Sequence, residues 1–485
     1  MSVFYLLFLL SLSYWYHLPV MTQALITYSE FRGYDILLVL ITGLLFRHYQ
    51  DPLRRFFAQD PPGRLLFRFT VWATIMSGVT IISCYYYAED NVWSLVTLMF
   101  LFHLWGFVLA YGGFRLFVRT PGQCLALLDT FLVVGIAEGL VICLQAVELL
   151  PLFWGDRYQE YGARAFSGTL GPNRQLPGYM MILVFAVAAA YWRNWRSIGL
   201  WRVGLSALGG LVSVLGVALS TSRTAWVAFA AFFLISFLGR RQFGFAAFAA
   251  AIVVATVFLV PEGIRERIEE VYYWRVAGPI ADTMNGVGAQ DDELGRLDAI
   301  DAGRLDIWSG GFETIVYERP WLIPFGGGFN NYLYAVSRGA SAHNMYMTLL
   351  GELGIVGLVL YVGWLFSIVR ESARLTRRAA EARLAGLKTF APVETGSLVL
   401  ALMVGLMAGE ILYAYRPSFT FMGSFLFLCA IMHHPALIYG TAAVGAAHDP
   451  REPEHKQRGW LLGPPGVSPL EPAVSPAAAQ TMVRG

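Results

Sequence analysis

Long apolar runs separated by short polar stretches recur along most of the chain. A helix that crosses the hydrocarbon core of a bilayer needs about 20 mostly apolar residues, and on this criterion the sequence predicts about twelve membrane spans. The second and eighth are short. The runs are 3–20, 28–46, 65–87, 92–114, 124–150, 176–192, 199–220, 224–239, 243–260, 344–369, 395–414 and 419–439. The pattern therefore predicts an all-α polytopic membrane helix bundle.

Two of the polar intervals between the runs are long, 151–175 and 261–343. The second lies between spans 9 and 10 and opens with PEGIRERIEEVYYWRV, whose amphipathic spacing predicts a helix along the membrane interface. Apolar spacing from Leu305 to Val316 predicts a further helix that stops before Pro320. We therefore expect a large loop that contains short helices.

The tail of the chain is rich in Pro and Ala and has no apolar periodicity, which is typical of a disordered end. The predicted elements divide the chain into four parts. These are 1–260 with spans 1 to 9, the large loop 261–343, 344–440 with spans 10 to 12, and the tail 441–485.

Composition supports the membrane interpretation. Of the 485 residues, 56% are hydrophobic and 14% are charged, and the mean hydropathy is +0.54. A soluble domain carries about a quarter charged residues. The net charge of +2 gives no indication of nucleic-acid binding. The four cysteines form no CxxC pair, and Walker, HExxH and G-x-S-x-G motifs are absent, so neither a metal nor a cofactor is expected.

Arginine and lysine indicate the orientation of the spans. Stretches rich in these residues, such as FRLFVR, WRNWR and RESARLTRRAAEARLAGLK, fall on alternate sides of successive runs, as one common face requires. The opposite turns carry little positive charge. The first run lacks a basic n-region and a cleavage site and is interpreted as a retained span. The positive-inside tendency then predicts that both termini are cytoplasmic.

Several residues on the predicted outer face run against that tendency. They are Arg164 and Arg174 on the first long outer loop, Arg223 in LSTSRTAW, Arg304 in the large loop, and His343 at the start of span 10. An arginine binds phosphate oxygens bidentately and does not deprotonate. A histidine can take a proton from an attacking hydroxyl near neutral pH. Together these residues would suit displacement of a diphosphate from a lipid-borne donor.

Each residue also has a plainer interpretation. An arginine at a helix end often extends to the headgroups, and Arg174 suits loop structure. His343 would help cap its helix together with Ser341 and Asn344. Glu352, further along the same span, would anchor a hydrogen-bond network. Glu138 and Glu410 are also intramembrane acids, and the sequence assigns them no partner.

The segment GRLDIWSGGFETIVYERPWLIPFGGGFNNY, followed by SAHNMYMTLLGELGIVGLVLY, resembles the signature region of the O-antigen ligase and polymerase superfamily. The earlier SRTAW and GTLGPN stretches are similar to two further motifs of that family. The resemblance covers roughly 160–370. It implies about twelve helices, a large periplasmic loop, and a place in the bacterial inner membrane.

The resemblance also implies an activity. Such proteins take a glycan from an undecaprenyl diphosphate carrier and pass it to an acceptor sugar, in a reaction described as metal-independent and inverting. The matching motif positions assign His343 to catalysis and Arg223, Arg304 and Arg164 to the donor diphosphate. Ser222, Asn344 and Glu352 would be supporting residues.

The expected function is therefore a glycan polymerase or ligase for surface polysaccharide, O-antigen or exopolysaccharide, with the polymerase favoured. The partners would be the lipid-linked oligosaccharide, an acceptor glycan or lipid A core, membrane lipids and other polysaccharide assembly proteins, but no nucleic acid. Protein as acceptor stays open. The alternatives are a transporter or flippase for a lipid-linked glycan, which would place charges near the midplane, and a membrane scaffold.

Overall fold

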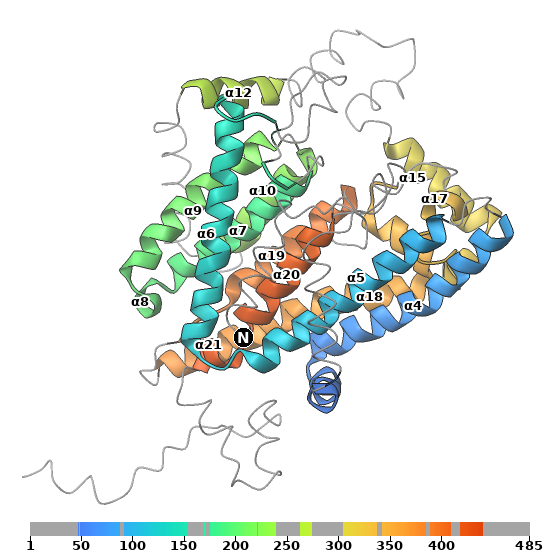
Figure 1. Ribbon diagram of the computed structural model, residues 1–485, viewed down its shortest axis with the longest axis horizontal. Coiled ribbons are helices and arrows are strands. Elements are labelled where there is room, and N and C mark those ends of the chain that lie inside the picture. Colours follow the sequence, from blue (N-terminus) through green and yellow to red (C-terminus); the bar gives the residue numbers. More distant parts are fainter. Residues whose placement is uncertain are drawn as a thin grey trace, which may run out of the picture.

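The computed structural model describes Arg47 and residues 49–87, 92–152, 166, 168–170, 175–220, 222–238, 262–273, 304–336, 342–384, 389–408 and 418–439. Within these ranges every regular element is a helix, which confirms the all-α prediction. The runs predicted at 3–20, 28–46 and 243–260 lie outside the described residues, and so does the tail 441–485. Figure 1 shows the arrangement of the described helices.

Nine predicted runs correspond to apolar helices, and among the described helices six are long and apolar enough to cross a membrane. The six are α4 (Pro61–Tyr87), α5 (Val92–Phe117), α6 (Pro121–Ala146), α7 (Gln175–Arg193), α9 (Leu200–Leu219) and α18 (Met345–Leu384). The shorter apolar helices are α10 (Arg223–Leu238), α19 (Val393–Gly405) and α20 (Ser418–Met432). The remaining elements are α8 (Trp195–Ile198), α12 (Glu262–Tyr272), α15 (Arg304–Glu313), η4 (Thr314–Glu318), α16 (Leu322–Phe325), α17 (Tyr332–Ala335), η5 (Leu406–Ala408) and α21 (Pro435–Tyr439).

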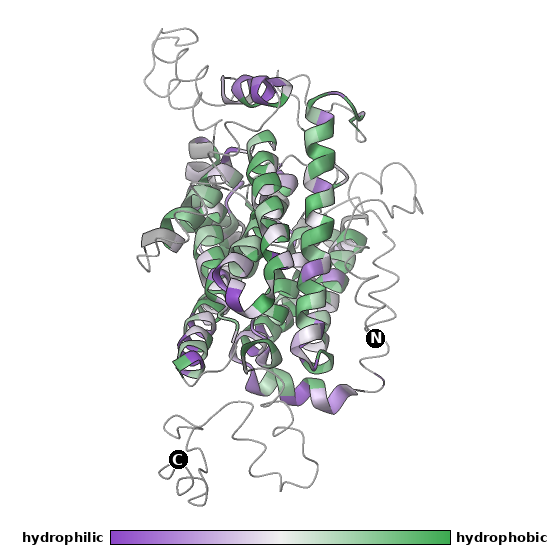
Figure 2. Cartoon of the chain, turned by 90° about the vertical axis from the view of Figure 1, so that its left-hand side faces the viewer, coloured by the Kyte–Doolittle hydropathy of each residue, from purple (hydrophilic) through white to green (hydrophobic). Residues whose placement is uncertain are grey.

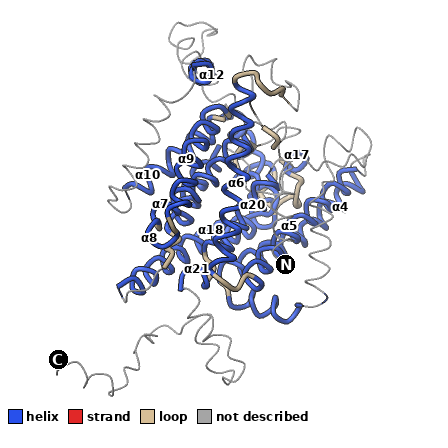
Figure 3. Tube along the Cα trace, turned by 60° about the vertical axis from the view of Figure 1, so that its left-hand side comes forward, coloured by secondary structure: helices blue, strands red, loops and turns tan. Residues whose placement is uncertain are grey.

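Two groups of helices pack on a central pair. In Figure 1, α6, α7, α9 and α10 lie on the left, α4, α5 and α18 on the right, and α19 and α20 between them. The most deeply buried helix is α7, in which every residue from Leu176 to Tyr191 is buried. Figure 3 shows that loops join the helices mostly at their ends. Apolar side chains of the central helices therefore form one core, while lipid-facing positions carry exposed apolar residues.

Close helix packing around α7 depends on glycine. A Cβ at Gly135 of α6 would lie 2.3 Å from Val184 of α7, and one at Gly216 of α9 would lie 2.6 Å from Met181. Small residues let helix backbones approach closely in a membrane, where no hydrophobic effect drives helices together. Gly135 and Gly216 thus lie on the faces of α6 and α9 that pack against α7.

One end of the bundle, which we call the arginine-rich end, joins helix termini through buried ion pairs. Arg115 at the end of α5 pairs with Asp60 before α4, at 3.3 Å. Arg193 at the end of α7 pairs with Glu394 at the start of α19. Arg202 of α9 contacts both carboxylate oxygens of Asp129 on α6 at 2.8–3.1 Å. The arginine-rich stretches thus meet on one face, as their alternation in the sequence predicts.

The opposite end, which we call the loop end, comprises 168–170, 222–223, α12, α15 and 342–344. Here α12 lies across the ends of α6 and α9, and Ile264 and Ile268 pack with Leu215 and Leu219. Arg267 of α12 contacts Glu148 at 2.7 Å. The hydrogen bond to Glu270 raises the pKa of Arg267. Figure 2 shows the hydrophilic residues of α12 at this end of the apolar bundle. The apolar face of α12 therefore meets protein, whereas its pattern predicted contact with the membrane interface.

The helix that follows His343 is broken. Within α18, Gly354 has φ 65° and ψ −170°, a conformation that no helical residue adopts. The segment before the break is 345–353, and the segment after it continues to Leu384. The predicted run of 344–369 is therefore two helical pieces, because glycine alone adopts that conformation without strain. In the large loop, α15 and η4 occupy Arg304–Glu318, close to the predicted helix.

Candidate functional site

Ser222 and Arg223 begin α10 at the loop end. Ser222 is 4% exposed, and its hydroxyl accepts a hydrogen bond from the backbone N–H of Ala225 at 3.3 Å. Its carbonyl accepts from the N–H of Trp226 at 3.0 Å. These are the contacts of an N-cap serine. Arg223 is then the first helical residue and half-buried, at the end of the helix where backbone N–H groups favour anions.

His343 and Asn344 occupy the equivalent place before α18. The Asn344 side-chain oxygen accepts from the N–H groups of Tyr346 and Met347 at 3.0 and 3.1 Å, so Asn344 is the N-cap. His343 is exposed, with a left-handed φ of 47°. A non-glycine residue in a sparsely populated conformation costs about 1–3 kcal/mol and persists only where its surroundings impose it. The capping interpretation therefore applies to Asn344, while His343 projects from the cap.

Trp308 of α15 provides part of that constraint. Its indole Nε1 donates to the carbonyl of Ala342 at 2.8 Å, and Ala342 is fully buried. Arg304 begins α15 one helical turn before Trp308. The side chain of Arg304 is outside the described residues, and its backbone begins α15 one helical turn before the residue that contacts Ala342. Sequence reasoning missed Trp308, although the IW pair in the signature segment contains it.

Near their starts, α10 and α18 each contact the end of α19. The Tyr346 hydroxyl donates to the carbonyl of Met403 at 2.7 Å. On the other side of α19, a Cβ at Gly405 would lie 2.8 Å from Ala228 of α10. Tyr346 is three residues after His343, and Ala228 is five residues after Arg223. Arg223 and His343, far apart in sequence, therefore lie at the starts of two helices that pack on the same end of α19.

Glu352 lies inside the broken helix and anchors a loop. Its carboxylate accepts from the backbone N–H groups of Asn330 at 2.8 Å and Tyr332 at 3.2 Å, and the residue is 4% exposed. A buried carboxylate requires such partners. These contacts agree with the interpretation of Glu352 as the anchor of a hydrogen-bond network.

Glu138 of α6 anchors residues of the loop that follows α6 in a similar way. It accepts from the backbone N–H and the hydroxyl of Thr169, both at 2.6 Å. Gln145 accepts from the N–H of Gly168 at 2.9 Å. Gly168 has φ 59°, and a Cβ there would lie 2.0 Å from the Glu138 carboxylate. The GTLGPN stretch is thus attached to α6 at its start, although the sequence assigned Glu138 no partner.

The other residues of the sequence-based hypothesis lie outside the described residues. These are Arg164, Arg174, Ser341 and Glu410. Among the described residues, no group of three or more His, Cys, Asp or Glu side chains could hold a metal ion. The described part of the site therefore consists of two helix starts, one short loop helix and two anchoring carboxylates.

Comparison with known proteins gives one family. Residues 208–362 match the family model described as O-antigen ligase, and the matched segment contains Arg223, Arg304, His343 and Glu352. No curated protein matches the chain. The match supports glycosyltransferase activity of the O-antigen ligase type in polysaccharide biosynthesis, a family whose substrates are in general lipid-linked oligosaccharide and lipid A core. With its apolar helices and this matched segment, the chain is a multi-pass membrane protein that carries an O-antigen ligase domain at residues 208–362.

Proposed function

We propose that the protein transfers or polymerises a glycan from an undecaprenyl diphosphate-linked donor onto an acceptor sugar at the periplasmic face of the bacterial inner membrane. The observation that carries the proposal is that two helices, one beginning at Arg223 and the other just after His343, both pack on the end of α19. A diphosphate donor and a hydroxyl acceptor need this combination of a cation and a titratable base in one place.

The proposed orientation rests on the charge of the two ends. Paired arginines gather at the arginine-rich end, which the positive-inside tendency assigns to the cytoplasm. The loop end would then face the periplasm, and both termini would be cytoplasmic. A lipid-linked donor already carries its leaving group, so a site on that face requires no nucleotide.

Donor binding is assigned to arginine and to helix geometry. Arg223 begins α10, where the helix dipole and unpaired N–H groups add to its charge. Arg304 and Arg164 are proposed as further ligands of the diphosphate oxygens. As charge grows on the leaving diphosphate, cations fixed in a partly dry site stabilise it without reorganising. Because these side chains supply positive charge at the leaving group, we propose a metal-independent reaction.

His343 is assigned to the acceptor. The acceptor hydroxyl oxygen attacks the anomeric carbon from the face opposite the diphosphate, which inverts that carbon. The hydroxyl proton passes to an imidazole nitrogen of His343. The bond from the anomeric carbon to the diphosphate oxygen breaks, and its electron pair remains on the diphosphate. Trp308 and Asn344 hold the backbone on either side of His343, so its position is set before the substrates arrive.

The acceptor is proposed to be a second carrier-linked glycan, which makes the protein a polymerase rather than a ligase to lipid A core. A flippase is the second candidate, because broken membrane helices are typical of transporters. In this protein, however, the break at Gly354 is filled by the backbone of Pro324 and Phe325, which lie within 2.7 Å of a Cβ placed there. A filled break favours a fixed site over alternating access.

The experiment is transfer in vitro with purified protein, an undecaprenyl diphosphate-linked repeat unit and EDTA. Wild type should lengthen the glycan, and His343→Ala and Arg223→Ala should not. Arg265→Ala is the matched control, because Arg265 is an exposed arginine at the same end that pairs with Glu262.

Three results would contradict parts of the proposal. Donor consumption only after addition of lipid A core would replace the polymerase by a ligase. Loss of transfer in EDTA that Mg²⁺ restores would overturn metal independence. Full transfer by both site variants would overturn the assigned residues.

A further inference from the structure

Residues 326–332 leave the large loop and run between α4 and α18. The N–H of Gly327 donates to the carbonyl of Gly351 at 2.7 Å, and the N–H of Gly328 donates to that of Glu352 at 2.9 Å. On the other side, the N–H of Phe329 donates to the carbonyl of Met76 on α4 at 3.2 Å. Sequence pattern alone assigns this stretch to a loop outside the membrane, yet both of its neighbours are candidate membrane spans.

The contacts lie well inside those spans. Met76 is eleven residues before Tyr87, the last residue of α4, which is about 16 Å along the helix axis at 1.5 Å per residue. Gly351 is six residues after Met345, the first residue of α18, which is about 9 Å. The contacts with α4 and with α18 therefore both place residues 326–332 inside the length of the two spans, away from the helix ends at the loop end.

Protein groups satisfy the polar backbone of the segment. Glu352 accepts from Asn330 and Tyr332, and the Thr80 hydroxyl donates to the carbonyl of Phe329 at 2.6 Å. The Asn331 side chain donates to the carbonyl of Gly327 at 2.7 Å. Irregular backbone at membrane depth is tolerated only where protein supplies its hydrogen bonds, because hydrocarbon offers none. A loop in water would not need a buried carboxylate for this purpose.

Glycine allows the segment to touch α18 backbone to backbone. A Cβ at Gly326 would lie 2.2 Å from the Glu352 carbonyl oxygen, and Gly326 has φ 79°. A Cβ at Gly328 would lie 2.4 Å from the Thr80 hydroxyl, with φ 110°. The GGG run therefore allows close packing of this segment between the two spans.

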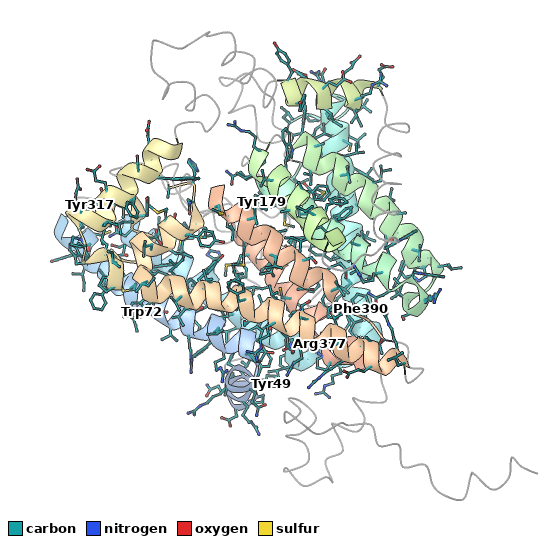
Figure 4. All side chains as sticks on the ribbon, turned by 180° about the vertical axis from the view of Figure 1, so that it is seen from behind. Tyr49, Trp72, Tyr179, Tyr317, Arg377 and Phe390 are labelled. Atoms are coloured by element: carbon teal, nitrogen blue, oxygen red, sulfur yellow. The ribbon has the colours of Figure 1, made fainter. Side chains whose placement is uncertain are left out.

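The chain just before this segment exposes aromatic side chains. Tyr317 is 75% exposed, Trp321 56% and Phe325 60%, and they recur every four residues. Phe325 lies at the break of α18, directly beside Gly354. Figure 4 shows Tyr317 at the outer edge of this group of helices, with Trp72 on the same side of the molecule. We call Tyr317, Trp321 and Phe325 the aromatic face.

The aromatic face continues a surface that lipid covers. Beyond Gly354, α18 exposes Ile355, Val356 and Val359, and α4 exposes Val79 and Ile82. These residues belong to candidate spans, so hydrocarbon is their expected neighbour. Tyrosine and tryptophan are the residues that concentrate where hydrocarbon meets headgroups.

We propose that residues 317–332 form a re-entrant membrane segment, whose aromatic face contacts the lipid bilayer in its outer leaflet and whose polar backbone is held by Glu352 and Thr80. The partner is the bilayer itself. The inference rests on hydrogen bonding, depth and exposure, and it holds whether or not the protein transfers glycan.

The test measures the surroundings of single cysteines. The four native cysteines, all buried, are replaced by alanine, and cysteine is placed in turn at Tyr317, Trp321 and Phe325. Each variant carries an environment-sensitive fluorophore in nanodiscs that contain lipids with a quencher at the headgroup or along the acyl chain. Val359→Cys is the lipid-facing control, and Glu266→Cys on α12 is the water-facing control.

Lipid quenchers should reduce the emission at Trp321 and Phe325 as they do at Val359, and the headgroup quencher should act most strongly at Tyr317. Glu266 should respond only to iodide in the water. Emission at all three positions that responds to iodide like Glu266 would overturn the proposal. Protection from both lipid and iodide would also overturn it, since protein would then cover the aromatic face.

A second variant tests the anchor. With the fluorophore at Phe325, Glu352→Ala should shift the emission to longer wavelength and raise its response to iodide several-fold. Glu371→Ala is the matched control, because Glu371 is a buried acid on the same helix that pairs with Arg374. Size-exclusion chromatography selects the folded fraction. A folded Glu352→Ala protein with unchanged emission would overturn the role given to Glu352.

Discussion

Buried or half-buried carboxylates occur at both ends of the bundle, but they have different partners. At the arginine-rich end, Asp60, Asp129 and Glu394 pair with arginine side chains. At the loop end, Glu138 and Glu352 accept hydrogen bonds from the backbone of loop residues. The first kind of contact joins one helix terminus to another. The second fixes a loop on a helix.

The difference separates an end held together by ion pairs from the end that carries the proposed site. Ion pairs between helix ends neutralise arginines and make that end rigid. At the loop end, Glu138 and Glu352 accept hydrogen bonds that hold loop residues on α6 and α18. The predictions below compare the two ends, from the largest expected effect to the smallest.

The largest contrast is between two histidines. His343→Ala should lower glycan transfer about 10²- to 10⁴-fold, the usual effect of losing a general base, and should leave the melting temperature nearly unchanged because the side chain is exposed. His433 is 1% exposed at the arginine-rich end, so His433→Ala leaves a cavity there and should lower the melting temperature with little change in glycan transfer. Transfer rates and thermal melts in detergent measure both. Equal losses of activity in the two variants would remove the distinction.

The next contrast concerns a buried ion pair. Glu394→Ala leaves Arg193 without its buried partner, and removal of one member of such a pair costs about 3–5 kcal/mol of stability. The double variant Arg193→Leu with Glu394→Leu should recover most of that loss, since two apolar residues need no partner. Denaturant unfolding of the purified protein is the measurement. A double variant as unstable as Glu394→Ala would show that the pair is not the cause.

A smaller effect is expected at Glu138. Glu138→Ala removes two hydrogen bonds to Thr169, and because Glu138 is half-buried and water can replace part of them, the expected total loss is about 1.5–3 kcal/mol. Thr169→Val removes the hydroxyl bond alone and should lose about half as much. Protease accessibility of the first outer loop, measured beside global unfolding, would report the local change. Unchanged accessibility in Glu138→Ala would contradict the anchoring role.

The smallest effect is expected at Trp308. Trp308→Phe removes the single bond to the Ala342 carbonyl, which contributes about 0.5–1.5 kcal/mol. Because that bond fixes the residue before His343, kcat should fall several-fold with little change in KM. Steady-state kinetics separates the two. A change in KM alone would indicate that Trp308 acts on substrate binding instead.

Much of the fold could be predicted from the sequence because hydrophobic runs of span length have one stable outcome in a bilayer. The runs 65–87 and 176–192 became α4 and α7 with small shifts at their ends. The shift at α6 has a local cause, since a capping box of Thr120 and Gln123 starts the helix at Pro121, before the apolar run. The arginine stretches also predicted correctly which helix ends share a face.

Part of the site could be predicted for a different reason. Arg223 and His343 stand out because charge at the outer end of a span runs against the usual bias, and their motifs resemble a known family. Trp308 and Glu138 did not stand out. A tryptophan near a membrane and an acid in a span each have many uses, and only a partner on another segment distinguishes them.

The sequence by itself determined the membrane class, most helix positions, the common arginine-rich face and the family signature, because these follow from local hydrophobicity and short spacing. The tertiary structure alone decided that α18 breaks at Gly354, that 326–332 fills the space beside that break, and that Glu138 and Glu352 hold the backbone of loop residues. The physical reason is that a buried polar group must find a hydrogen-bond partner, and that partner lies on a segment distant in sequence.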